Sequence, residues 1–428
     1  MADLFGIARE APRDTEWLTP TKLVRDDRAK NASFERGARL AHRALGKVKP
    51  MRRTLAFLGL LSFVGMCAAC SSTSDGSSSA KRAPGVGIGD GEIPGAADGD
   101  HSAAPGASES AGAPSGGADS SATGAGATGG QGSVPSGVLT AGTWDDNRNF
   151  DMFLSYRAQA QSTAGAPPIP EQEHRDAFSL WSGSRPSKSV LDVSLVIDTT
   201  GSMGDEMAYL RSEFLAIHAS IADKYPTAAQ RWSLVVYKDV HDPYVVRWFD
   251  FRVDPNDFAS HLAAQTADGG EDYPESPERA LEIASQLAWR GDEAAKLAFW
   301  VTDAPHHEKD AAVMAQSIRD LRSRGVHLYP VAASGADALT EETMRAGAQL
   351  TGGRFLFLTD DSGIGNAHEV PRVPCFFVTK LNDAILRMID VELTGQYHEP
   401  DASQVLRTGG DPQSGRCSLS GDQQATIF

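Results

Sequence analysis

Apolar residues follow two alternating patterns along the second half of the chain. Short apolar runs bounded by Asp, Gly, Pro or Ser predict buried strands at 191–198, 231–239, 244–253, 297–303, 327–334 and 354–360. In the intervening segments, apolar residues recur every three or four positions, which predicts amphipathic helices. We expect these helices at about 207–221, 255–265, 277–289, 311–324, from 340 onward, and 380–395.

This alternation predicts one α/β domain over residues 191–395 with a largely parallel sheet, because parallel neighbours need helical crossovers. The run at 244–253 follows its predecessor after the short turn HDP, so we expect it to be an antiparallel strand at one edge. The last helix should end at Gly395, which suits a left-handed C-cap. Its packing face is expected to consist of Leu381, Ile385, Met388, Ile389 and Leu393.

Two segments flank the predicted domain. Residues 143–190 begin with aromatic-rich text (TWDDNRNFDMFLSYRAQ) that we expect to pack on the domain as an extra strand or helix. The tail at 396–428 is rich in turn residues and has short strand-like pieces. Residues 71–142 consist mainly of Gly, Ala, Ser and Pro, which bury too little apolar surface to fold, so we predict a disordered tether.

A targeting segment precedes the tether. From Met51, two Arg residues lead into the apolar stretch 55–66, which is too short for a membrane span, and small residues then lead to Cys70. The segment resembles a bacterial lipoprotein signal, although Cys67 stands where Leu is usual. The resemblance implies that Cys70 is lipidated and that the protein is anchored in the cell envelope, on the outer membrane or surface of a Gram-negative bacterium.

A signal of this kind belongs at a protein's start, yet residues 1–50 precede it and show no clear periodicity. We interpret Met51 as the true start and residues 1–50 as an upstream misreading of the gene. The alternative is a cytoplasmic tail in front of a short anchor. An exported location favours a disulfide between Cys375 and Cys417, which would tie the tail to the segment before the last helix.

The formal net charge of the 428 residues is −16, and no basic stripe appears in the predicted domain. Nucleic-acid binding requires clustered Lys and Arg, so we expect no nucleic-acid partner. The simplest consequence of the acidity is solubility.

Candidate chemistry lies where predicted strands end. DTTGS places Asp198, Thr200 and Ser202 on alternate positions after one strand, and Asp303 ends another. A Gly-rich acidic loop, ADGGEDYPES, lies between them in sequence. Ligands of α/β sheets collect at the carboxyl ends of the strands. Since hard divalent cations prefer carboxylate, hydroxyl and water oxygens, these loops predict a cation site.

Three motifs in this order, DTTGSM, GGEDYPES and VTDAPHH, resemble those of the von Willebrand factor A (vWA) domain and its metal-ion-dependent adhesion site (MIDAS). The resemblance extends from about residue 191 to 393. It implies a Rossmann-like, doubly wound, mostly parallel sheet flanked by helices. It also implies a divalent metal ion, Mg²⁺ first and Mn²⁺ or Ca²⁺ as alternatives, and a protein partner that binds through an acidic side chain.

The resemblance also assigns roles to residues. Thr200 and Ser202 match the hydroxyl ligands, Asp303 matches the third-loop carboxylate, and Asp198 matches the carboxylate that often reaches the metal through water. The second loop lacks the Thr of integrin-like domains and resembles a bacterial DTTGSM subgroup with an acidic ligand. We expect Asp272 in that role, with Glu275 as the alternative. The added negative charge should make the ion less attractive to an acidic partner.

Simpler interpretations exist for the same residues. Asp198 could only cap the following helix, and Asp303 with Pro305 could only form a turn. His306 and His307 suggest a transition-metal site, but adjacent side chains point in different directions, so we expect no ligand role for them.

Several functions remain compatible with these patterns. The leading hypothesis is a divalent-cation-dependent protein-binding module on a membrane-tethered lipoprotein. The alternatives are a metal-assisted hydrolase, a subunit of an enzyme complex, and an ion that only stabilises the loops. The sequence has no GxSxG, HExxH or GxxxxGK[ST] motif, and no nucleophile–base pair stands out. We therefore expect a binding protein and not an enzyme.

Overall fold

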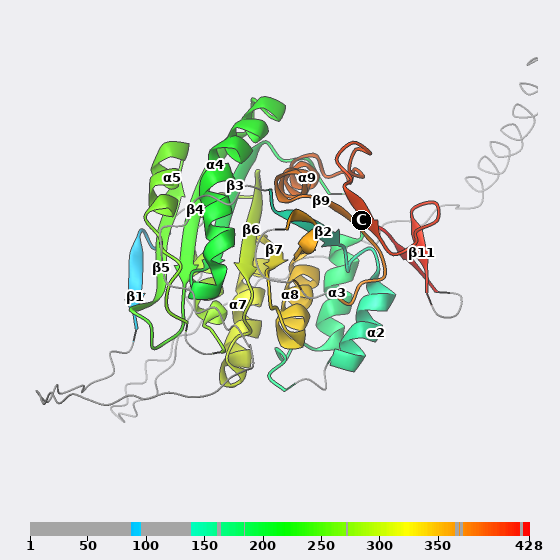
Figure 1. The fold of residues 1–428 in the computed structure, drawn as a ribbon, viewed down its shortest axis with the longest axis horizontal. Coiled ribbons are helices and arrows are strands. Elements are labelled where there is room, and N and C mark those ends of the chain that lie inside the picture. The colour runs from blue at the N-terminus through cyan, green and yellow to red at the C-terminus, as the bar shows by residue number, and fades with distance from the viewer. Residues whose placement is uncertain are drawn as a thin grey trace, which may run out of the picture. The chain divides into compact units, whose positions relative to one another are not determined.

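The computed structural model describes residues 87–95, 138–160, 164–183, 185–270, 273–363, 368, 371–419 and 423–428. Within them, one sheet has ten strands in the order β1-β5-β4-β3-β6-β7-β8-β2-β9-β10 (Figure 1). Its strands are β1 (Gly91–Pro94), β2 (Thr140–Trp144), β3 (Val190–Asp198), β4 (Ala229–Tyr237), β5 (Tyr244–Arg252), β6 (Ala294–Thr302), β7 (His327–Ala332), β8 (Phe355–Thr359), β9 (Phe376–Lys380) and β10 (Arg407–Gly409).

Five parallel strands form the centre of the sheet, in the order β4, β3, β6, β7 and β8. In β3, Leu191, Val193, Leu195 and Ile197 pack on one face, while Val196 packs on the other. Both faces are covered, which explains why the central strands appear in the sequence as continuous apolar runs. The α/β class predicted from the alternation of elements is confirmed.

Antiparallel strands extend both sides of this centre. β5 pairs with β4 as expected, but it is not an edge strand, because β1 pairs with its other side. On the opposite side, β2 lies between β8 and β9 and is antiparallel to both. The sheet is therefore mixed and has more antiparallel strands than the single one expected. β1 and the first three residues of β2 lie within the range 71–142 that was predicted as a disordered tether, so regular structure occurs inside that range.

Helices cover the two faces of the sheet (Figure 1). On one face lie α4 (Gly204–Lys224), α5 (Pro255–Ala263) and α9 (Leu381–Thr394). On the other lie α6 (Pro277–Gln286), α7 (Ala311–Ser323) and α8 (Ala338–Thr351). The predicted stripe of α9 is buried, and Gly395 caps the helix in the left-handed conformation.

The flanking segment 143–190 contributes two more helices, α2 (Phe150–Ala160) and α3 (Glu171–Trp181), which pack against α8. Every residue of α8 from Leu339 to Thr351 is buried as a result. Its charged side chains are paired in the interior, as in the contact of Arg345 with Asp146 at 2.7 Å. A helix that has an ordinary polar composition in sequence is thus enclosed by its neighbours.

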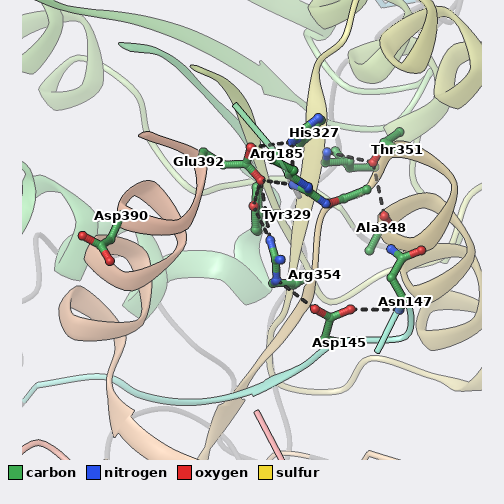
Figure 2. Close-up of polar contacts among 12 residues, drawn as sticks. Asp145, Asn147, Arg185, His327, Tyr329, Ala348, Thr351, Arg354, Asp390 and Glu392 are labelled. Atoms are coloured by element: carbon green, nitrogen blue, oxygen red, sulfur yellow. Dashed lines mark hydrogen bonds and ion pairs between the residues drawn. The ribbon is translucent and has the colours of Figure 1, made fainter. Parts of the chain in front are cut away.

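A buried polar network joins α9 to β7 and to the flanking segment (Figure 2). Glu392 of α9 accepts hydrogen bonds from Arg185 at 2.7 Å and from Tyr329, and it forms an ion pair with His327 at 2.7 Å. Arg354 continues the network to Asp145 at 3.0 Å. Removing one partner from such a cluster leaves a buried charge unpaired, so the network holds α9 firmly in place.

The tail folds back on the domain. Cys375 and Cys417 form a disulfide, as expected from the export argument. It links the start of β9 to a small separate sheet of β11 (Arg416–Ser418) and β12 (Gln424–Thr426). Asn149 exchanges hydrogen bonds of 2.9 and 2.7 Å with the backbone of Thr426, which ties this sheet to the flanking segment.

The predicted signal segment at 51–70 with Cys70, the extension 1–50 and most of the tether lie outside the described residues. Among the helices that are described, none has the length and apolar character needed to cross a membrane.

Candidate functional site

Three loops meet at the carboxyl end of the central strands. β3 and β6 are parallel neighbours, with Ile197 beside Val301, so the loops that follow them leave the sheet together. The backbone N–H of Gly201 donates to the carbonyl of Gly269 at 3.0 Å, which joins the first loop to the second. Glu275 N–H donates to Pro305 at 3.0 Å and joins the second loop to the third. The three predicted motifs thus form one assembly.

Asp198 lies at the centre of this assembly and is fully buried. Its Oδ1 accepts hydrogen bonds from the backbone N–H and the hydroxyl of Thr200, at 2.9 and 2.8 Å. Its Oδ2 accepts one from the hydroxyl of Thr302 at 2.8 Å. Burial raises the pKa of Asp198 to about 7, and the nearby charge of Asp303 adds to the shift. Since both oxygens already have donors, Asp198 is placed to orient the hydroxyls of its neighbours.

The two predicted hydroxyl ligands lie next to each other, and Thr200 also contacts Asp198. The Thr200 and Ser202 oxygens are 3.4 Å apart. Asp303 is 2% exposed, and burial raises its pKa. Among the described residues, its Oδ1 has no hydrogen-bond partner. Such an orphaned buried oxygen is rare and costly unless another group satisfies it.

The second loop brings Glu275 into the same assembly. Glu275 is 3% exposed, and its Oε2 has no partner among the described residues. Burial raises its pKa to about 10, helped by the charge of Asp198 and of further carboxylates. Asp272, the predicted second-loop ligand, lies outside the described residues. The structure therefore describes only the alternative of the two, and it places that residue beside Thr200.

A glycine makes this close approach possible. Gly270 has a φ of +67°, and an added β-carbon would lie 2.5 Å from the β-carbon of Thr200 and 2.9 Å from Oε1 of Glu275. No side chain fits between the first and second loops at this point. Glycine also adopts this backbone conformation without the cost that other residues incur.

Neighbouring residues hold the loops in place. The buried ammonium of Lys238 donates to the carbonyl of Thr199 and to Asp268, both at 2.7 Å. His307 bonds to Asp239 at 2.6 Å, and His306 bonds to the carbonyl of Gly165 at 2.9 Å. Neither histidine is hydrogen-bonded to the predicted metal-binding carboxylates in the part of the chain described.

The sequence reasoning missed two residues of this assembly, Thr302 and Lys238. Each had a signal: Thr302 directly precedes Asp303, and Lys238 stands at the end of a predicted strand beside the first loop.

The donor set fits a hard cation by its chemistry. Two carboxylates with orphaned oxygens and two hydroxyls belong to the three loops that meet here. A positive ion would offset the cost of burying the two carboxylates, which raises their pKa values. Within the described residues, no three His, Cys, Asp or Glu side chains converge as a metal-binding group. The assembly instead mixes carboxylates with hydroxyls.

Comparison with known proteins agrees with the motifs. Residues 192–346, just over a third of the chain, match the family model of the von Willebrand factor A domain. This part of the chain is similar to a vWA domain. The match spans the segments from β3 into α8, so the three loops lie inside the matched range, whereas β1, β2, α2, α3 and the tail lie outside it.

Solved structures that the comparison matches to this chain include BatB, a conserved hypothetical protein of Bacteroides thetaiotaomicron, with 10% identity and a TM-score of 0.32. That alignment covers 47% of this chain and 98% of BatB. Another is SpaC, a pilus adhesin of Lactobacillus rhamnosus GG in an open conformation, with 13% identity and a TM-score of 0.30. Here the alignment covers 39% of this chain and 27% of SpaC. No curated protein sequence matches the chain.

Proposed function

We propose that the vWA domain binds a divalent cation at this assembly and uses it to bind a protein partner. The observation that carries the proposal is the pair of buried, orphaned carboxylate oxygens of Asp303 and Glu275 beside two hydroxyls. The ion would be held by Thr200, Ser202 and Asp303 with an acidic second-loop residue. Asp198 would act through a bound water, because its own oxygens accept hydrogen bonds from Thr200 and Thr302.

Two residues of the second loop, Asp272 and Glu275, are candidates for its metal ligand. Asp272 was expected from the sequence, but the burial of Glu275 and its position beside Thr200 support Glu275. The oxygen-only donor set favours Mg²⁺, which also keeps several waters, with Mn²⁺ and Ca²⁺ as competitors. In each case a partner carboxylate would replace one of those waters.

The chemistry of the surroundings limits the partner. Ser202 is exposed, so the site opens to solvent at this edge of the sheet. Tyr273 is 58% exposed and lies near Asp303, whose charge adds to the rise that burial causes in the pKa of Tyr273. An exposed aromatic ring next to a cation suits a protein surface that offers one acidic side chain within an apolar patch. The net charge of −16 disfavours a nucleic acid. We assign no chemical step to the ion.

The location proposed for this module is the cell envelope, with a lipid on Cys70 as its anchor. The support is the signal-like segment from Met51 and the Gly-, Ala- and Ser-rich sequence that follows it. Because β1 pairs with β5 of the domain, the proposed tether consists of the 16 residues 71–86. A coil of that length has a root-mean-square reach of roughly 20–24 Å. Incorporation of labelled palmitate into the protein, lost in Cys70→Ala, tests the anchor. Peptides from residues 1–50 in protein from its own cell would contradict the proposed start at Met51.

A thermal-shift titration with Mg²⁺, Mn²⁺ and Ca²⁺ tests the cation site. Ligand that binds only the folded state raises its stability by about 2.7 kcal/mol at 100 times Kd. The wild type should be stabilised, Asp303→Ala should not respond, and Asp223→Ala should respond as the wild type does. Asp223 is the matched control, because it is an exposed Asp near the far end of α4. Equal responses in all three proteins would refute the site.

Binding of the partner needs a separate experiment. A crosslinking pull-down from envelope extracts should recover a protein with the wild type in Mg²⁺ but not in EDTA, and not with Asp303→Ala. Equal recovery of the partner in Mg²⁺ and in EDTA would refute metal-dependent binding of the partner. That result would not bear on the cation site, which the thermal-shift titration tests.

A further inference from the structure

Three residues outside the cation assembly form a hydrogen-bonded relay. The hydroxyl of Ser334 lies 3.1 Å from Nε2 of His368, and Nδ1 of the same ring lies 2.8 Å from Oδ1 of Asp360. Ser334 follows β7 and Asp360 follows β8, which are parallel neighbours, so both stand at the carboxyl edge of the sheet. These contacts are those of a nucleophile (Ser334), a general base (His368) and a carboxylate that orients the base (Asp360).

The hydrogen bonds assign a role to each nitrogen of the ring. Asp360 accepts from Nδ1–H and also from the backbone N–H of His368 at 2.9 Å, which fixes the ring. Nε2 is then free to accept the proton of the Ser334 hydroxyl. The side chain of His368 is 3% exposed and that of Asp360 is 63% exposed. The base is therefore shielded from solvent, whereas the carboxylate is in contact with it. The two hydrogen bonds from His368 lower the pKa of Asp360, which keeps it ionised.

Both loops that carry the relay are anchored. The backbone N–H of Ala333, next to Ser334, donates to the carbonyl of Thr302 at 2.9 Å. Asp361, next to Asp360, forms a two-pronged pair with Arg407 of β10 at 2.7 and 2.8 Å. The nucleophile and the acid are therefore positioned independently of each other.

A small recess adjoins His368 and Ala333, the residue before Ser334. Apolar side chains, among them Phe355, Phe357 and Leu358, line it together with the Glu341 carboxylate. Gly335 follows the serine with a φ of +91°, and its N–H has no acceptor among the described residues. A backbone N–H directly after the nucleophile is a common donor to the oxyanion of acyl transfer.

We propose that Ser334 and His368, positioned by Asp360, form a catalytic site that hydrolyses short-chain carboxylic esters. Ser334 Oγ attacks the carbonyl carbon while its proton passes to His368 Nε2. The bond to the leaving alkoxide then breaks, and His368 returns the proton to give the free alcohol. Water attacks the acyl-serine with His368 as base, which releases the carboxylic acid and restores the serine. This activity does not depend on the proposed cation.

The experiment uses the full chain and two probes, a fluorophosphonate label and p-nitrophenyl acetate. In the wild type, mass spectrometry should find the phosphonyl group on the peptide that contains Ser334, and EDTA should not change the yield. Ser334→Ala should lose the label and the ester turnover. Ser323→Ala, which removes a hydroxyl bonded only to a carbonyl one turn back on α7, should keep both. The labelled wild-type peptide decides the matter even if Ser334→Ala fails to fold.

The partners of the serine have distinct expected effects. His368→Ala should lower kcat by about 100-fold or more, because a positioned base contributes that much. Asp360→Asn should lower kcat by roughly tenfold at unchanged KM, since an exposed carboxylate is screened, and Asp360→Glu should recover most of it. Ester turnover equal in wild type and Ser334→Ala, no label on the Ser334 peptide of the wild type, or a label only elsewhere, would overturn the proposal. A relay that only joins two loops would leave Ser334 unlabelled and give equal turnover in the two proteins.

Discussion

Loss of the disulfide should loosen one end of the molecule and leave the rest intact. The bond joins Cys375, fully buried at the start of β9, to Cys417, 3% exposed on β11. These two residues form a small cluster of their own with Ile427, apart from the two main hydrophobic clusters. The perturbation is the double variant Cys375→Ala/Cys417→Ala, compared with the reduced wild type.

The size of the effect follows from the closed loop. The two cysteines are 42 residues apart, which corresponds to a chain-entropy contribution of about 4 kcal/mol in the unfolded state. The segment between them includes α9, which the Glu392 network and its apolar stripe hold in the core. Removal of the disulfide should therefore lead to local opening of β10, β11 and β12.

Hydrogen exchange read by mass spectrometry, together with denaturant unfolding, measures both quantities. Peptides covering 407–427 should exchange faster in the double variant, while those from α4 and β3 should keep their protection. The free energy of unfolding should fall by about 4 kcal/mol or somewhat less. Reductant should change the wild type and leave the double variant unaffected. Protection lost evenly over the domain, or a free-energy change below about 1 kcal/mol, would refute this reasoning.

Three further predictions concern the loop glycine, a buried ion pair and a buried histidine. Gly270→Ala should abolish the response to Mg²⁺ and destabilise the domain more than Gly89→Ala, which shares a φ near +70° but meets no atom within 4 Å. Arg345→Met should lower the free energy of unfolding, measured with denaturant, by about 3–5 kcal/mol, because it leaves buried carboxylates without a charged partner. Arg175→Met, in an exposed pair on α3, should cost less than about 1 kcal/mol. Burial lowers the pKa of His174 to about 3, so unfolding should become easier as pH falls from about 6.5, by about 2 kcal/mol at pH 5.

Each of these predictions has a result that would contradict it. An equal fall in the free energy of unfolding in the two glycine variants would show that the close approach of the loops at Gly270 has no special cost. An equal fall in the two arginine variants would show that burial of the ion pair does not set its contribution to stability. For the histidine, the folded state must stay neutral while the unfolded state takes up a proton below its ordinary pKa. His174→Gln should therefore flatten the stability profile between pH 6.5 and 5, and an unchanged slope would assign the effect to other groups.

The central α/β pattern could be predicted because its elements are long and periodic. The helix α4 has Met207, Leu210, Phe214 and Ile217 on one face, and all four are buried as the spacing requires. β2 could not be predicted in its place between β8 and β9. Its sequence, TAGTW, is short and contains a glycine, and its partners lie more than 200 residues away. The burial of α8 is equally invisible in the sequence, since it depends on where α2 and α3 pack.

The candidate cation site could be predicted to the level of its loops, because strand ends and oxygen-rich turns are local signals. Which second-loop carboxylate faces Thr200 depends on the path of that loop and could not be deduced from spacing. The relay of Ser334, His368 and Asp360 carries no motif at all, since the serine and histidine are 34 residues apart. It arises only when β7 and β8 align.

The most direct test of the cation site is a crystal structure of the domain grown with Mn²⁺, with anomalous diffraction to locate the metal. The account predicts one strong peak within coordination distance of Thr200, Ser202 and Asp303, at about 2.1 Å if Mg²⁺ takes its place. It also predicts that Glu275 completes the protein ligands, with Asp272 as the alternative. No peak at this edge of the sheet, in protein saturated with metal, would contradict the account.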